Sequence, residues 1–298
     1  MKYLRILLFC FFSITCSQYL LAQDLMDLLK EDKPATEYAF ATFKTTRIVL
    51  GQSIENPAKG TLQFLVEHNF GKLNEGAYNM WGLDRSTIRL GLEYGINDRI
   101  AVNIGRSSYE KTFDGAIKAK ILRQRSGTRN IPLSLSLYGG TMLYSYKWTD
   151  PTRKNYFSSH LSYIAQLLIA RKFSNSLSFQ LTPTMIHKNL VLTREAQNDI
   201  FAVGVGGRFK VTQRTSLNAE YFYLLPGNTA DTYRNCLSVG CDIETGGHVF
   251  QFRLTNAQPM FERGFITETT GEWGKGDIYF GFTINRVFTL NSSSHRKN

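Results

Sequence analysis

The 298-residue sequence has no long apolar run beyond its N-terminus. No segment after residue 22 approaches the ~20 consecutive apolar residues that a membrane-spanning helix requires. If the mature chain crosses a membrane, we therefore expect it to cross as strands.

Cysteine and histidine are also scarce. Of four cysteines, Cys10 and Cys16 lie near the start, which leaves Cys236 and Cys241 in the stretch 227–247, whose composition is typical of a loop. In an oxidising compartment two nearby loop cysteines usually pair, so we predict a Cys236–Cys241 disulfide. A metal site is not expected, because only His248 lies near these cysteines and it falls in a predicted strand.

Acidic residues are outnumbered, with 24 Asp and Glu against 35 Lys and Arg and a net charge of +11. The basic residues are scattered and form no stripe, and this argues against nucleic-acid binding. Attraction to phosphate-bearing lipopolysaccharide or to anionic solutes fits the same charge.

The N-terminus has the pattern of a secretory signal peptide. Lys2 and Arg5 precede an apolar run that starts at Ile6, and the small residue Ala22 marks a cleavage site, which predicts a signal over residues 1–22. A membrane anchor and a lipoprotein modified at Cys16 are the alternatives. Residues 23–37 are predicted to form a short amphipathic helix in the periplasm or the barrel mouth.

The final strand carries the clearest alternation. In residues 275–290 the apolar residues Ile278, Phe280 and Phe282 fall on one face, and Gly281 and Thr283 fall on the other. A short polar tail, 291–298, follows. This pattern is typical of the closing strand of an outer-membrane barrel.

The same alternation recurs along the chain and predicts an all-β fold, a single transmembrane antiparallel β-barrel over residues 38–290. The expected strands number about twelve and lie near 38–50, 60–71, 86–95, 99–108, 112–124, 133–148, 159–173, 176–186, 200–210, 215–225, 247–256 and 277–288.

The polar face of these strands is expected to line the lumen. The charged residues assigned to it are Glu67, Arg89, Glu93, Lys118, Lys120, Arg208, Glu220 and Arg253. Arg89 and Glu93 lie four residues apart on one strand, too far for direct contact, so each is expected to find its partner on an adjacent strand.

The connections alternate between tight turns, as at 97–98 and 174–175, and long loops, as at 187–199 and 226–246. Short turns usually face the periplasm, but twelve strands in this arrangement would place them outside. An extra crossing near each end, giving up to fourteen strands, or a segment threaded through the lumen would resolve the conflict.

Hydrolase chemistry is a further alternative, because His160 and Ser162 share a strand face and Glu220 could orient the histidine. By the expected register these side chains face the lumen, away from lipid. Gly204 to Gly207 lie within an alternating strand, where glycine permits curvature or close packing and does not form a phosphate loop.

The runs GLDRSTIRLGLEYGINDRIAVNIGRSSYEKTFDGAIKAKILRQ and ITETTGEWGKGDIYFGFTINRVFTL, with EHNFG before them, resemble an uncharacterised outer-membrane β-barrel family of Bacteroidota. The segment GRSSYEKTFDG is the most distinctive part. The resemblance implies a barrel in the outer membrane of a Gram-negative cell and no established activity.

Two classes of function remain open. The first is a porin-like channel or transporter for small solutes, and the second is a structural or interaction barrel with a filled lumen. A lipid-modifying enzyme is a weaker third reading. We expect no cofactor and no metal, and as partners outer-membrane lipid, lipopolysaccharide and the barrel-insertion machinery.

Overall fold

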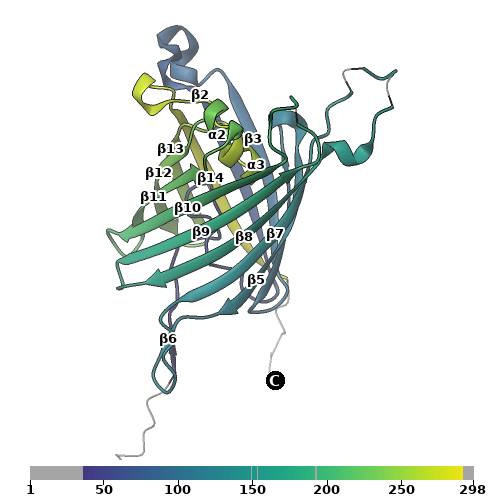
Figure 1. The fold of residues 1–298 in the computed structure, drawn as a ribbon. Coiled ribbons are helices and arrows are strands. Elements are labelled where there is room, and N and C mark those ends of the chain that lie inside the picture. Colours follow the sequence, from purple (N-terminus) through teal and green to yellow (C-terminus); the bar gives the residue numbers. More distant parts are fainter. Residues whose placement is uncertain (1–35, 149, 153, 192, 291–298) are drawn as a thin grey trace, which may run out of the picture. The chain divides into compact units, whose positions relative to one another are not determined.

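Twelve antiparallel strands close into one barrel (Figure 1). The computed structural model describes residues 36–148, 150–152, 154–191 and 193–290. The predicted signal peptide and polar tail lie outside this range. The wall strands are β2 (Thr61–Lys72), β3 (Ser86–Gly95), β4 (Ile100–Ser107), β5 (Phe113–Leu122), β7 (Ser134–Leu143), β8 (Leu161–Lys172), β9 (Leu177–Lys188), β10 (Asp199–Lys210), β11 (Thr215–Leu224), β12 (Cys236–Thr245), β13 (His248–Thr255) and β14 (Tyr279–Thr289).

Closure joins the first wall strand to the last. Thr289 pairs with Thr61, and the ladder continues to Tyr279 opposite Lys72 with one irregularity beside Gly281. A Cβ at Gly281 would lie 2.0 Å from Asn69 Oδ1, so a larger residue would force the two strands apart. Since every wall strand has two neighbours, the sheet has no free edge.

The predicted strand at 38–50 is wrong, and so is the predicted loop at 227–247. Residues 42–54 are almost entirely buried on both sides and belong to no wall strand, whereas residues 236–245 form β12 between β11 and β13. The two errors cancel, so the number of strands is still twelve. The observed strands also remove the conflict over which side carries the short turns, because both ends of the wall lie on the same side as the turns 96–99, 173–176, 211–214 and 246–247.

The long connections carry the helical turns. These are η1 (Leu73–Glu75), η2 (Ala77–Gly82), η3 (Tyr109–Lys111), η4 (Phe157–His160), α2 (Asn228–Thr232), α3 (Glu262–Thr267) and η5 (Trp273–Lys275). Among the described residues no helix is long and apolar enough to cross a membrane, an observation that does not bear on crossing by strands. Separately, β1 (Glu37–Tyr38) and β6 (Arg125–Ser126) form a small antiparallel pair within a compact unit of their own.

The core of the barrel lies in its lumen. Buried apolar side chains come from the inner faces of β7 to β12 and from two segments that are not part of the wall. We call residues 39–59 the lumen segment and residues 257–271, which include α3, the lumen loop. The lumen segment is part of the purple trace inside the barrel in Figure 1.

Candidate functional site

Polar side chains of the wall satisfy the backbone of the lumen segment. Lys118 Nζ donates to the carbonyl oxygens of Ser53, at 3.1 Å, and Glu55, at 2.8 Å. The backbone N–H groups of Leu50 and Gly51 each donate to Glu220 Oε1 at 2.9 Å. A buried segment outside any sheet must find such partners, because an unpaired buried backbone group is costly. The inward polar residues thus bind a part of the chain itself.

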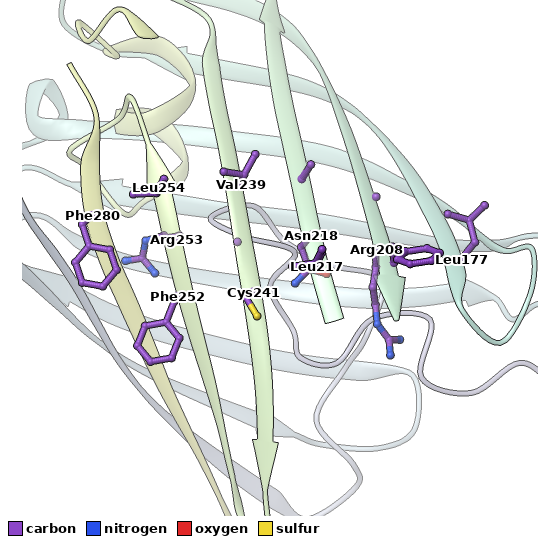
Figure 2. Close-up of a pocket in the computed structure, with 14 residues that line it drawn as sticks. Leu177, Arg208, Leu217, Asn218, Val239, Cys241, Phe252, Arg253, Leu254 and Phe280 are labelled. Carbon is purple, nitrogen blue, oxygen red and sulfur yellow. The ribbon is translucent and has the colours of Figure 1, made fainter. Parts of the chain in front are cut away.

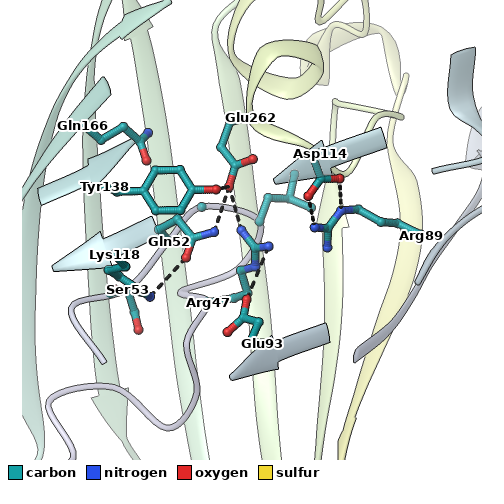
Figure 3. Close-up of polar contacts among 12 residues, drawn as sticks. Arg47, Gln52, Ser53, Arg89, Glu93, Asp114, Lys118, Tyr138, Gln166 and Glu262 are labelled. Atoms are coloured by element: carbon teal, nitrogen blue, oxygen red, sulfur yellow. Dashed lines mark hydrogen bonds and ion pairs between the residues drawn. The ribbon is translucent and has the colours of Figure 1, made fainter. Parts of the chain in front are cut away.

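Glu262 on α3 joins the lumen loop to the lumen segment (Figure 3). Its Oε1 accepts hydrogen bonds from Arg47 Nη1 at 2.7 Å, Gln52 Nε2 at 2.9 Å and Tyr138 Oη at 3.3 Å. Arg47 Nη2 also lies 3.6 Å from Glu93 Oε1 on the wall. Arg47 and Glu262 are 2% and 1% exposed, so this junction lies away from bulk water.

Arg89 forms a second buried cluster on the wall. Its guanidinium pairs with Glu67, directly opposite on β2, and its Nε donates to Asp114 Oδ1 on β5 at 2.9 Å. The predicted cross-strand partner of Glu93 is wrong, because this residue, four residues along β3, has its ion-pair partner Arg47 in the lumen segment. Arg89 and Glu93 therefore point inward and have separate partners.

Opposing effects act on the ionisation of Glu262. Burial by itself would raise the pKa of this carboxyl group, but the guanidinium groups of Arg47 and Arg89 lower it below its ordinary value. In the β4–β5 connection the balance is reversed, since burial and the nearby Glu268 raise the pKa of Glu110. Glu262 is therefore held as a carboxylate at neutral pH.

The remaining inward residues also have partners inside the barrel. Arg208 Nη1 donates to Ala41 O at 2.7 Å, and Arg253 Nε donates to Asn69 Oδ1 at 2.8 Å. Lys120 is only partly buried, with its Nζ 3.9 Å from Glu55 Oε2. The structure thus places all eight predicted side chains on the inner face, and most of them contact the lumen segment or each other.

Part of the lumen is filled by an apolar cluster, which the alternation pattern does not predict. Ile164 and Leu168 of β8 point inward and pack in one cluster with Ile48 and Leu50 of the lumen segment and Phe265 of the lumen loop. The signal was present in β8, where Ile164 and Leu168 make both faces apolar, a pattern typical of a strand buried on both sides. Gly206 belongs to the same contact, since a Cβ there would lie 2.6 Å from Ile48 Cδ1.

The predicted disulfide is wrong, because both cysteines are free thiols on one strand. Cys236 points inward and is fully buried, whereas Cys241 is partly exposed on the outer face, opposite Phe252. Residues five apart on a strand project to opposite faces about 17 Å apart along the chain, beyond the reach of a disulfide.

The three candidate hydrolase residues do not form a catalytic group. Glu220 is bonded to the lumen segment, Ser162 Oγ donates to Met142 O, and the His160 ring stacks on Trp148 at 3.7 Å. In the part of the chain that the structure describes, no cluster of three His, Cys, Asp or Glu side chains could hold a metal ion.

A cavity of about 460 Å³ opens among the long connections, which we call the loop-side cavity. It is lined by Arg263 and Glu268 of the lumen loop and by Tyr144, His160 and Lys188, among others. Arg263 pairs with Glu110, and Lys188 Nζ lies 2.7 Å from Glu268 Oε1.

A second concavity, of about 730 Å³, lies on the outer wall over β10 to β13 (Figure 2). It forms because Gly207 and Ala219 leave a gap among the larger outward residues Leu217, Val239 and Phe252. Its surface is almost wholly apolar, as expected of a wall that faces lipid chains.

Comparisons with known proteins agree with this architecture. A family model described as membrane bound beta barrel domain (DUF5777) matches residues 43–288. No curated protein matches the chain.

Several solved structures are similar at low identity. The NanC porin is 6% identical with a TM-score of 0.46, over 76% of this chain and 98% of that chain. The KdgM porin is 10% identical with a TM-score of 0.43, over 78% and 99%. The COG4313 outer membrane channel from Pseudomonas putida F1 is 14% identical with a TM-score of 0.48, over 78% and 97%.

Proposed function

The chain belongs to the membrane bound beta barrel domain family (DUF5777), and from this premise we propose that it is an outer-membrane channel for small solutes whose lumen is closed by a releasable plug. The plug consists of the lumen segment and the lumen loop. The protein acts without catalysis, and solutes pass only when the plug shifts.

The observation that carries the proposal is the junction at Glu262. This carboxylate joins the two halves of the plug through Arg47 and Gln52. Among the described residues the plug contributes no strand to the barrel wall, and its one bridge to the wall, Lys59 opposite Gly95, lies at the end of the lumen segment. Ion pairs and hydrogen bonds of this kind can be exchanged for others at a cost far below that of opening the barrel, whose ladders run through all twelve strands.

Unpaired polar atoms support release over permanent closure. Arg47 Nε and Thr46 Oγ1 are buried without a hydrogen-bond partner among the described residues. Each such atom costs about 1–3 kcal/mol relative to a paired one, so the closed arrangement is weaker than a fully satisfied network. A weaker closed arrangement favours a plug that opens over the main alternative, a structural or interaction barrel whose filled lumen never opens.

The location in the outer membrane is supported by the signal-like N-terminus together with the closed barrel. Lipopolysaccharide and the barrel-insertion machinery belong to the proposal as partners, the first through the excess of basic residues and the second because a barrel of this kind must be inserted.

Single-channel recording in planar bilayers tests the proposal. The wild-type protein should be closed for most of the time, with brief openings. Arg47→Ala/Glu262→Ala should raise the open fraction clearly, because it removes the ion pair that joins the two halves of the plug and leaves Glu93 without its partner in the lumen segment. The matched control is Arg234→Ala/Glu272→Ala, which removes an exposed pair 2.9 Å apart between two long connections and should conduct like the wild type.

Folding of each variant is checked by heat-modifiable migration on gels. A folded Arg47→Ala/Glu262→Ala protein that never conducts would contradict the channel and favour the filled barrel. A wild-type protein that is constantly open would contradict the plug.

A further inference from the structure

We infer that the loop-side cavity binds a neutral, hydroxyl-rich ring, a short uncharged sugar, and this inference rests on the proposed function because it names the solute class. The cavity of about 460 Å³ falls within the range that holds small ligands. Its lining comes from the long connections and strand ends around one mouth of the barrel.

Charge in the cavity is balanced. Its ionisable lining residues, histidine aside, are three cations and three carboxylates, Lys147, Lys188, Arg263, Glu110, Glu195 and Glu268. Arg263 contacts Glu110 and lies 3.5 Å from Glu268, which is also bonded to Lys188. An ion that bound at one of these pairs would have to displace a partner that is already present. The two remaining side chains, Lys147 and Glu195, carry opposite charges, so the lining itself has no net charge. The cavity therefore favours an uncharged ligand.

The rings of the cavity suit the C–H face of a sugar. Tyr144 lies edge-on to His160 at 5.4 Å, and Trp148 stacks on the same histidine. Tyr233 lines the cavity as well. Aromatic faces carry partial negative charge and attract the slightly positive C–H groups of a pyranose ring.

Hydroxyl and amide groups stand beside these rings. Ser159, Thr229, Thr232 and Asn228 line the same cavity, together with the carboxylates, and they offer both donors and acceptors. Thr232 and Asn228 already donate to backbone carbonyl oxygens nearby. A purely apolar solute would bury the hydroxyl groups of Ser159 and Thr229 without new partners, which costs free energy for each one. A ring with an apolar face and a rim of hydroxyl groups satisfies both parts of the lining.

Part of the cavity lining belongs to the plug. Arg263 lies in the short helix α3 that presents Glu262 to Arg47, and Glu268 directly follows that helix. A sugar that hydrogen-bonds to Arg263 or Glu268 therefore contacts the element that closes the lumen. The site is placed so that an entering solute meets the gate before the pore.

Isothermal titration calorimetry tests the inference on the folded full-length protein in lauryldimethylamine oxide, a detergent without a sugar head group. Maltotriose should bind saturably, and the acidic probe trigalacturonate should bind at least roughly tenfold more weakly. Tyr144→Ala should weaken maltotriose binding roughly tenfold through loss of a ring contact.

Tyr156→Ala is the matched control, since Tyr156 is 56% exposed in the same connection and does not line the cavity. It should bind like the wild type. His160→Ala serves as a second variant if Tyr144→Ala fails the heat-modifiability check. The absence of saturable maltotriose heat, wild-type affinity in the ring variants, or tighter binding of trigalacturonate would each overturn the inference.

Binding is measured here without an open pore. Saturable maltotriose binding to a protein that never conducts would contradict the channel alone, whereas conduction without maltotriose binding would contradict the sugar site alone.

Discussion

Lys118 and Lys120 lie on the same inner face of β5 but have different contacts. Lys118 Nζ holds the carbonyl oxygens of Ser53 and Glu55, whereas Lys120 Nζ reaches only a carboxylate oxygen 3.9 Å away. Lys118→Met should leave two buried carbonyl groups unpaired at about 1–3 kcal/mol each and loosen the lumen segment. Lys120→Met should have little effect.

Hydrogen–deuterium exchange of peptides that span residues 50–58 measures this difference. Faster exchange is expected in Lys118→Met alone. Equal rates in both variants would show that Lys118 does not hold the lumen segment.

Glu262 should make the plug sensitive to acid. Because its folded pKa lies below the ordinary value of 4.5, ionised Glu262 stabilises the closed state above that value, and the contribution is lost as the pH falls through the lowered pKa. The open fraction in bilayers should therefore be constant from neutral pH down to the ordinary pKa of 4.5 and should rise only as the pH falls below that value. Glu262→Gln should lack this rise, and an identical acid response in that variant would assign it to another group.

At the scale of the element, β12 determines the chemistry of both cysteines. The strand directs Cys236 into the lumen and Cys241 outward, so the two thiols remain separate whatever the redox conditions. After unfolding without reductant, maleimide should label both residues, and mass spectrometry should find two adducts. Cys236→Ser/Cys241→Ser should migrate on gels like the wild type. A single species that resists labelling until it is reduced would show that the register of β12 is wrong.

At the same scale, the apolar inner face of β8 packs against the lumen segment. The inner face of β8 carries Ile164 and Leu168, which would be misplaced in a water-filled pore and are instead covered by Ile48 and Leu50. Burial of apolar surface at this contact stabilises the plug in addition to its ion pairs.

For the whole molecule, closure of the sheet predicts resistance to mild detergent. All twelve strands are paired on both sides, so no edge is available from which the ladder can unravel. The purified protein should migrate faster on gels before boiling than after it, with a circular dichroism spectrum dominated by strands. Identical migration of boiled and unboiled protein, or a helical spectrum, would contradict a closed barrel.

The barrel and most of its strands could be predicted from local pattern, because alternation reports on the two environments of a single strand. In β3, for example, Arg89 and Glu93 alternate with outward apolar residues, and the structure has them buried inside. The site was harder to predict. The inward charges could be identified, but the period of two that the sequence predicts from about Tyr38 onward places their main partner, the lumen segment, in the wall.

By itself the sequence determined the class of the fold, since period-two alternation at membrane-crossing length has one stable solution in lipid, a closed sheet. Only the tertiary structure decided which alternating segment enters the wall. Residues 236–245 pair with β11 and β13, whereas residues 42–54 are surrounded by wall side chains such as Lys118 and Glu220 and remain inside. The physical reason is that strand pairing and lumen filling depend on neighbours distant in the chain, and an isolated segment carries no record of which neighbours satisfy its backbone.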